Sequence, residues 1–253
     1  MSLNTAISGL QSFQQQINVV GNNIANVNTT AFKSARTDFE DSFSQALSGG
    51  MQVGSGVNLA AIPSNFNQGT ISSTGVGSDL AIVGQGFFTV RNATDSTAIY
   101  ATRAGDFHLD SVGYLITNDG LQVLGVGSVP LQVDPLTVAS FSIDQKGFIN
   151  VVKKDGTTAQ SGQVQLVSFA DTSQLVKQGD NRYSWTAAAG PSTFAAPQTA
   201  GLGTIQSGAL ELSNVDLTVE MSNLIIAQRA FQANARIITT SDEVMQEVVN
   251  LKR

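Results

Sequence analysis

The sequence predicts an α+β fold in which long N- and C-terminal helices pair as an α-helical coiled-coil core and carry a central antiparallel all-β domain, sandwich- or barrel-like. Both ends of the chain repeat apolar residues every seven positions, the spacing of a helix that packs along another helix. Between the ends, turn signals separate short strand-like runs. The predicted division is a core domain of 1–38 and 210–253, an extended linker at 39–79 and a β-rich outer domain at 80–209.

The N-terminal stretch has two apolar rows and carries no charged side chain between Met1 and Phe32. A solvent-facing helix normally places Lys and Glu on its outer face, so a charge-free polar face indicates a helix surrounded by protein on several sides. An ordinary amphipathic helix docked on its own domain is the alternative interpretation. The two rows are Leu3, Leu10, Ile17 and Ile24, and Ala6, Phe13, Val20 and Val27.

After the first helix, the chain loses the seven-residue repeat and becomes rich in Gly, Ser and Asn up to Asp79. Residues 46–56 are expected to form a loop, and 57–62 and 69–73 are candidate short strands. A stretch of this length with little regular structure is uncommon in a compact domain and is often functional or extended.

The β pattern runs from Leu80 to about Gly203. Asn118-Asp119-Gly120 separates two apolar runs, and Asp-Gly tolerates the positive φ of a tight hairpin turn. The remaining expectations are hairpin turns at 144–147 and 155–156, a strand at 164–169, and a return linker rich in Gly, Pro and Ala at 190–203.

The C-terminal helix is predicted to begin at Ser213-Asn214, with Asp216 and Glu220 in its first turn, where the helix dipole favours negative charge. Thr240 and Glu243 match a capping box, which would allow a break, but the repeat continues unshifted and favours one continuous helix. The repeating row is Leu217, Leu224, Phe231, Ile238 and Met245. A partner row at plus four is Met221, Gln228, Ala235, Asp242 and Val249.

Composition excludes several classes of protein. The 253 residues carry a net charge of -6, with no basic stripe to neutralise nucleic-acid phosphates. The chain has no cysteine, so it can form neither a disulfide framework nor a thiolate metal site. Neither a signal peptide nor an apolar run of the roughly 20 residues needed for a membrane helix is recognisable, which alone suggests a cytoplasmic protein without membrane insertion.

No residue pattern indicates catalysis, a cofactor or a metal site. His108, the only histidine, falls on the polar side of a strand-like run and is expected to be a surface residue. The aspartates lie beside turn residues, where Asp commonly caps turns with its own side chain. Tyr183 and Trp185 could face a ligand, but packing is the preferred interpretation.

Several motifs, taken in order, resemble those of the rod and hook family of bacterial flagellar axial proteins. One departure is Ala31, where the family usually has Gly, which predicts a tighter or partly helical turn. The motifs are Ser8-Gly9-Leu10, the run from Gly21 to Thr29, Phe32-Lys33, the run from Asp79 to Phe88, the run from Tyr100 to Gly105, Ser213 to Leu217, and Ala227 to Asn234.

This resemblance implies a non-enzymatic structural subunit that polymerises helically into a hollow axial tube and transmits motor torque to the filament. Within the family, the C-terminal sequence and the short 46–56 connection favour a short hook protein, with a distal rod protein as the alternative. A non-flagellar β-domain adhesin or an enzyme with an unrecognised carboxylate pair explains less of the sequence. The expected subunit-interface residues are Leu3, Leu10, Phe13, Ile17, Val20, Ile24, Val27, Leu217, Leu224, Phe231, Ile238 and Met245.

The resemblance also implies partners and a location. The expected partners are further copies of the chain and neighbouring axial proteins of the rod, hook, hook–filament junction and hook cap. The chain would be exported to the flagellum by the flagellar type III apparatus without a cleaved signal peptide, which replaces the cytoplasmic expectation.

Overall fold

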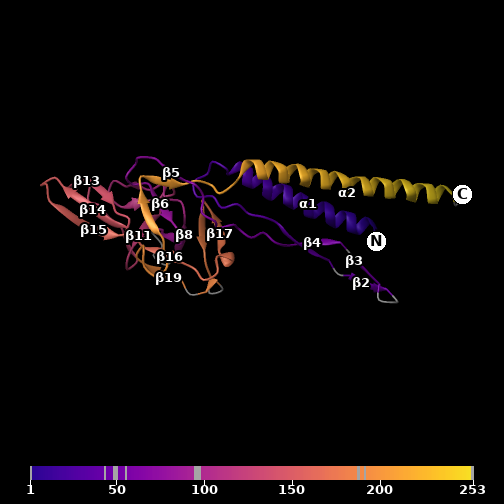
Figure 1. Ribbon diagram of the computed structural model, residues 1–253, viewed down its shortest axis with the longest axis horizontal. Coiled ribbons are helices and arrows are strands. Elements are labelled where there is room, and N and C mark those ends of the chain that lie inside the picture. Colours follow the sequence, from indigo (N-terminus) through magenta and orange to yellow (C-terminus); the bar gives the residue numbers. More distant parts are fainter. Residues whose placement is uncertain are drawn as a thin grey trace. The chain divides into compact units, whose positions relative to one another are not determined.

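A computed structural model of the chain contains two compact units (Figure 1). The helical unit comprises 1–27, 33–65 and 215–253, and the β unit comprises 28–32 and 66–214. No helix among the described residues is both long and apolar enough to cross a membrane. The structure describes residues 2–42, 44–47, 51–54, 56–93, 98–186, 189–190 and 192–251, with the backbone alone at 2–3, 44–47 and 51–53.

Two helices pack side by side in the helical unit: α1 (Ser2–Ala25) and α2 (Leu217–Leu251) (Figure 1). Gly9 lies against Asn234, where an added Cβ would come within 2.8 Å of the Asn234 amide nitrogen. Asn23 donates a hydrogen bond to Glu220 Oε1 at 3.1 Å. Because residue 9 lies beside 234 and residue 23 beside 220, the two helices run antiparallel.

The helix α2 is continuous, as predicted, and passes through Thr240 without a break. The hydroxyl groups of Thr239 and Thr240 bond to carbonyls within the preceding turn, which satisfies them inside the helix. The predicted cap at Ser213-Asn214 is wrong: Asp216 caps the helix by accepting from the backbone N–H groups of Thr218 and Val219.

The second row of α2 lies at plus three, not at the predicted plus four. Within the helix, the only fully buried residue is Ala227, and the more exposed Met221 and Gln228 flank it on the solvent side. Apart from the part-buried Asn223, Ala230 and Ala235, the residues shielded from solvent alternate at spacings of three and four: Glu220, Leu224, Ala227, Phe231, Asn234, Ile238 and Ser241. We call this row the α2 seam.

Four short strands follow α1 in the helical unit, and they include the stretch expected to be a loop. Strands β2 (Ser44–Leu47) and β3 (Met51–Gly54) pair antiparallel, as do β1 (Asp38–Asp41) and β4 (Val57–Ala61). The Phe13 and Phe39 rings lie 6.3 Å apart, and the Val57 N–H donates to Ser8 Oγ. These contacts join the strands to α1.

The β unit is built from antiparallel strands, as the sequence predicted. The largest sheet has the order β17-β18-β8-β7-β11-β10-β9, with β16 and β12 attached to β7 and β11, and β19 to β16. A separate sheet has the order β13-β14-β15, and β20 and β21 pair with β6 and β5. The strands are β5 (Ile71–Ser73), β6 (Leu80–Val83), β7 (Phe87–Arg91), β8 (Ile99–Thr102), β9 (His108–Leu109), β10 (Leu115–Ile116), β11 (Gln122–Gly125), β12 (Val129–Pro130), β13 (Val138–Ile143), β14 (Phe148–Lys153), β15 (Thr158–Gln163), β16 (Leu166–Ser168), β17 (Val176–Gly179), β18 (Arg182–Ser184), β19 (Thr193–Ala195), β20 (Thr204–Ser207) and β21 (Ala209–Glu211).

The predicted hairpin turns are confirmed: β10 pairs with β11 around Asn118-Asp119-Gly120, β13 with β14, and β14 with β15. The prediction of a plain linker at 190–203 is wrong, because β19 lies there and pairs with β16. The main core gathers apolar residues from strands far apart in sequence, among them Leu80, Phe88, Val123, Ile149, Leu166 and Ile205.

Candidate functional site

The predicted interface residues fall into three groups by burial. Val20 is buried, whereas Leu217 and Met245 are exposed. The side chain of Leu3 lies outside the described residues. The part-buried remainder are Leu10, Phe13, Ile17, Ile24, Val27, Leu224, Phe231 and Ile238. The structure therefore shields the middle of each row from solvent and leaves the two ends of the α2 row open.

Polar residues that apolar periodicity missed lie in the contact between the helices. The amide of Asn23 is buried and pairs with the backbone of Ala35 in both directions, donating to its carbonyl at 2.8 Å and accepting from its N–H at 3.0 Å. The same amide donates to Glu220, which links α1, α2 and residue 35. Asparagine and glutamate do not register in a hydrophobic pattern, so apolar periodicity could not signal this role. Only Glu220, seven positions before Ala227, follows the spacing of the seam.

Helix α2 exposes many large apolar side chains along its length. Isolated exposed apolar residues are normal, but many of them along one helix favour contact with another protein. The exposed members are Leu217, Val219, Met221, Ile225, Ile226, Ile237, Val244, Met245, Val248, Val249 and Leu251.

A buried ion pair fixes the strands of the β unit. Arg103 Nη1 lies 3.4 Å from Glu211 Oε2, and the two side chains are only 6% and 0% exposed. Arg103 also donates to the Gly84 carbonyl at 2.8 Å, and Glu211 accepts from the Gly69 N–H at 2.8 Å. Burial lowers the pKa of Arg103, against the opposing effect of the Glu211 carboxylate. Since the pair joins four segments, its role is structural.

The five-residue segment 28–32 belongs to the β unit although it directly follows α1. Its Ala31 N–H donates to the Glu211 carbonyl at 2.8 Å, and the Thr30 carbonyl accepts from the Asn181 amide at 2.7 Å. Ala31 is fully buried and has a φ of 55°, so alanine keeps here the left-handed conformation that glycine adopts more easily. The segment is thus anchored on the β unit by its backbone.

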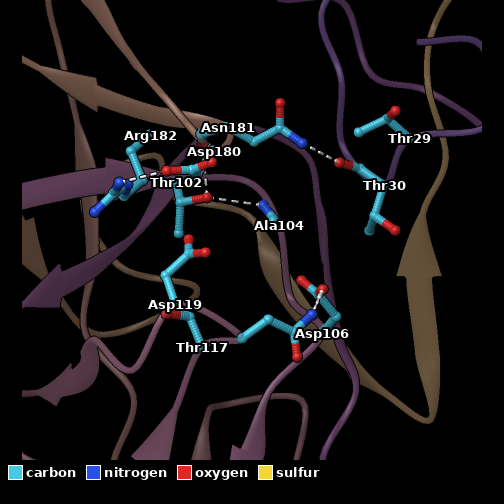
Figure 2. Close-up of a pocket in the computed structure, with 11 residues that line it drawn as sticks. Thr29, Thr30, Thr102, Ala104, Asp106, Thr117, Asp119, Asp180, Asn181 and Arg182 are labelled. Carbon is cyan, nitrogen blue, oxygen red and sulfur yellow. Dashed lines mark hydrogen bonds and ion pairs between the residues drawn. The ribbon is translucent and has the colours of Figure 1, made fainter.

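Beside this segment lies a polar pocket of about 220 Å³ (Figure 2). Asp106, Asp119 and Asp180 line it, and Arg182 pairs with Asp180 at 2.6 Å. The Asn118 amide donates to Asp106. No group of three or more described His, Cys, Asp or Glu residues could hold a metal ion. The pocket therefore presents hydrogen-bonding groups and the negative charge of its aspartates to solvent.

The structure places the two aromatic residues that could have faced a ligand, Tyr183 and Trp185, and the histidine His108. Tyr183 is buried against Phe66 and Phe87, and the Trp185 ring packs on Phe169 and Phe194. Packing is therefore confirmed for both aromatic residues. The exposed His108 also matches its prediction as a surface residue.

Replacing Asp106 with asparagine is expected to raise stability at neutral pH. Burial raises the pKa of Asp106, helped by the nearby carboxylates of Asp79 and Asp119, so the folded state binds the proton more tightly than the unfolded state. Stability from this group is present at low pH and is lost as the pH rises through the folded-state pKa. Asp106→Asn should therefore raise the free energy of unfolding near neutral pH, by no more than a few tenths of a kcal/mol because solvent screens the half-exposed carboxylate, as measured by urea unfolding.

The gain should shrink as the pH falls below the raised pKa, because the wild-type carboxyl is then also neutral. Asp155→Asn is the matched control, since Asp155 is exposed at the β14–β15 turn. An equal gain at low and neutral pH would contradict the assignment to Asp106 ionisation.

Three family models match different parts of the chain. Residues 3–33 match the model described as flagella basal body rod protein, and residues 81–151 match the flagellar hook protein FlgE/F/G D1 domain. Residues 206–251 match the flagellar basal body rod FlgEFG protein C-terminal model. The matched parts include nearly all of α1, strands β7 to β13 of the β unit, and α2.

Curated relatives match over their whole length. The chain is 44% identical to the flagellar basal-body rod protein FlgG of Bacillus subtilis, with 100% of this chain and 99% of the relative covered. It is 34% identical to the protein of the same name from Caulobacter vibrioides, with 99% of each covered. The flagellar hook protein FlgE of Borreliella burgdorferi is 25% identical, also with 99% of each covered.

These relatives do not support the prediction of a hook protein, and the alternative of a distal rod protein fits them better. The motifs behind the hook prediction lie largely in the terminal helices, which rod and hook models share, so they separate the two poorly. Matching models at both ends and in the middle, together with full-length relatives above 30% identity, establish the relationship. The chain belongs to the family of flagellar rod and hook proteins, the axial structural proteins of the bacterial flagellum.

Proposed function

We propose that the chain is a distal rod subunit that polymerises helically into a hollow tube and transmits torque along the flagellar axis. The observation that supports rod over hook is the 44% identity to a rod protein across both full lengths. The large apolar side chains that α2 leaves exposed support polymerisation, because contacts with further copies would remove them from water. Exposed apolar residues then become contacts between copies.

In this proposal α1 and α2 form a coiled-coil pair that belongs to the inner layer of the tube, and the predicted interface residues act there. The three- and four-residue alternation of the α2 seam supports the pairing, since it is the spacing of knobs-into-holes packing. The strand-rich residues 80–209 form the outer layer. Further copies of the chain and the neighbouring axial proteins are its partners, and the flagellar type III apparatus exports it.

Electron microscopy of the purified full-length chain at rising concentration tests this function. The expected result is straight, rigid tubes, whereas curved tubes would overturn the choice of rod. Deleting residues 1–27 should abolish the tubes, because the deletion removes α1 and leaves the α2 seam without the helix that packs against it. Circular dichroism and a retained thermal transition would show that the β unit of the truncated chain still folds.

If concentrated protein stays monomeric, basal-body fragments can be added as nuclei for growth. Growth from their ends would support the rod role. Failure of the wild-type chain to add to such nuclei would contradict it.

A further inference from the structure

The last turns of α2 extend beyond α1 (Figure 1). Gly9 lies beside Asn234 and the helices are antiparallel, so α1 begins opposite Ser241. Residues 242–251, which we call the overhang, therefore have no α1 residue opposite them and extend about 15 Å at the rise of an α-helix. Every described residue of the overhang is exposed.

The α2 seam continues into the overhang at the same spacing. After Ile238 and Ser241, the next seam positions are Met245 and Val248, which are 60% and 59% exposed. Val244, Val249 and Leu251 widen the apolar face on both sides of the seam. The side of α2 that packs against α1 in residues 220–241 is therefore open to solvent in the overhang, where a second protein can bind it.

A different exposed surface lies in the first half of α2. Ile225 and Ile226 are exposed, and Arg229 and Arg236 lie on the same side of the helix, one and three turns farther on. Neither arginine forms an ion pair among the described residues, although Arg229 bonds to Gln232 at 3.4 Å. We call these four residues the basic face.

We propose that the overhang of one copy packs on the basic face of a second copy; this rests on the proposed polymerisation. The apolar side of the overhang would cover Ile225 and Ile226. The overhang also carries three acidic side chains, Asp242, Glu243 and Glu247, whose carboxylates would pair with the two arginines. Opposite charges flanking matched apolar surfaces favour this occupant over an unrelated partner.

One copy cannot satisfy both surfaces by itself. Positions 226 and 248 lie on one continuous helix, about 33 Å apart at 1.5 Å per residue. The contact therefore joins two different surfaces on two copies, and each added copy presents a new overhang. A contact of this heterologous kind repeats along a fibre without closing.

Disulfide cross-linking tests the contact directly, because the chain has no cysteine of its own. The variant carries Ile226→Cys and Val248→Cys, and no internal disulfide can span the distance between these positions. After assembly and mild oxidation, a ladder of covalent oligomers is expected on a non-reducing gel. The matched control pairs Ile226→Cys with Gln246→Cys, which lies on the polar side of the overhang and should yield at least about tenfold less ladder.

Charge reversal supplies a second measurement that does not depend on oxidation. Arg229→Glu with Arg236→Glu should raise the concentration needed for assembly by about tenfold or more, and adding Glu243→Lys with Glu247→Lys should restore most of the loss. Tubes that form without a ladder and ignore the charge reversals would overturn this contact while leaving the rod function standing. A wild-type chain that never adds to tubes or nuclei would overturn the rod function and, with it, this contact.

Discussion

Arg103→Met is expected to lower the free energy of unfolding of the β unit by about 3–5 kcal/mol. The substitution keeps an unbranched side chain of similar length but leaves the Glu211 carboxylate buried without its cationic partner. It also removes the hydrogen bond to the Gly84 carbonyl and the guanidinium that lies 5.2 Å from the centre of the Phe87 ring. Calorimetry or urea unfolding of the full-length chain measures the loss.

Asp180→Asn is the control for Arg103→Met. It breaks the more exposed pair with Arg182, and asparagine tolerates the positive φ of 49° at this position, so its cost should stay below about 1 kcal/mol. Adding Glu211→Leu to Arg103→Met should recover part of the stability, because no buried charge then remains. Equal losses in Arg103→Met and Asp180→Asn would show that burial does not give this pair its importance.

Ala227→Asp is expected to abolish polymerisation while leaving the β unit folded. Ala227 is fully buried on the α2 seam, and a carboxylate there would be buried without a partner against α1. The cost of several kcal/mol should separate the two helices and remove the pairing on which the proposed inner layer depends. Electron microscopy and sedimentation report the loss of tubes.

Gln228→Asp places the same charge on the neighbouring, exposed residue of α2 and should leave tube formation intact. In both variants the melting temperature of the β unit should stay within about 2 °C of the wild type, since neither residue belongs to it. Tubes from Ala227→Asp at wild-type concentrations would contradict a role for the seam in assembly.

Local patterns predicted the local parts of the fold. The Asn118-Asp119-Gly120 turn and the continuous repeat of α2 were predicted correctly because their geometry depends on nearby residues. The pairing of β6 with β20 was not predictable in this way, because residues more than 100 positions apart meet there. Strands β2 and β3 were missed because their Gly- and Ser-rich surroundings resemble a loop.

The candidate surface was predicted only in part, for a related reason. The seven-residue row of Leu224, Phe231 and Ile238 is present, but its neighbouring row consists of Glu220, Ala227, Asn234 and Ser241, which are small or polar. Apolar counting therefore favoured the plus-four row, whose ends are Met221 and Val249. Small residues such as Ala227 allow the helices to approach closely, and hydrophobicity scales give that property little weight.

The connection between the two units has a mechanical consequence. The backbone passes from one unit to the other at 27/28, 32/33, 65/66 and 214/215, so four backbone connections join the units. A pulling or turning load is shared among these connections, and cleavage of the backbone at any one of them leaves three intact. A single linker would let the units rotate about its backbone bonds. Four connections resist such rotation because they would have to wind around one another.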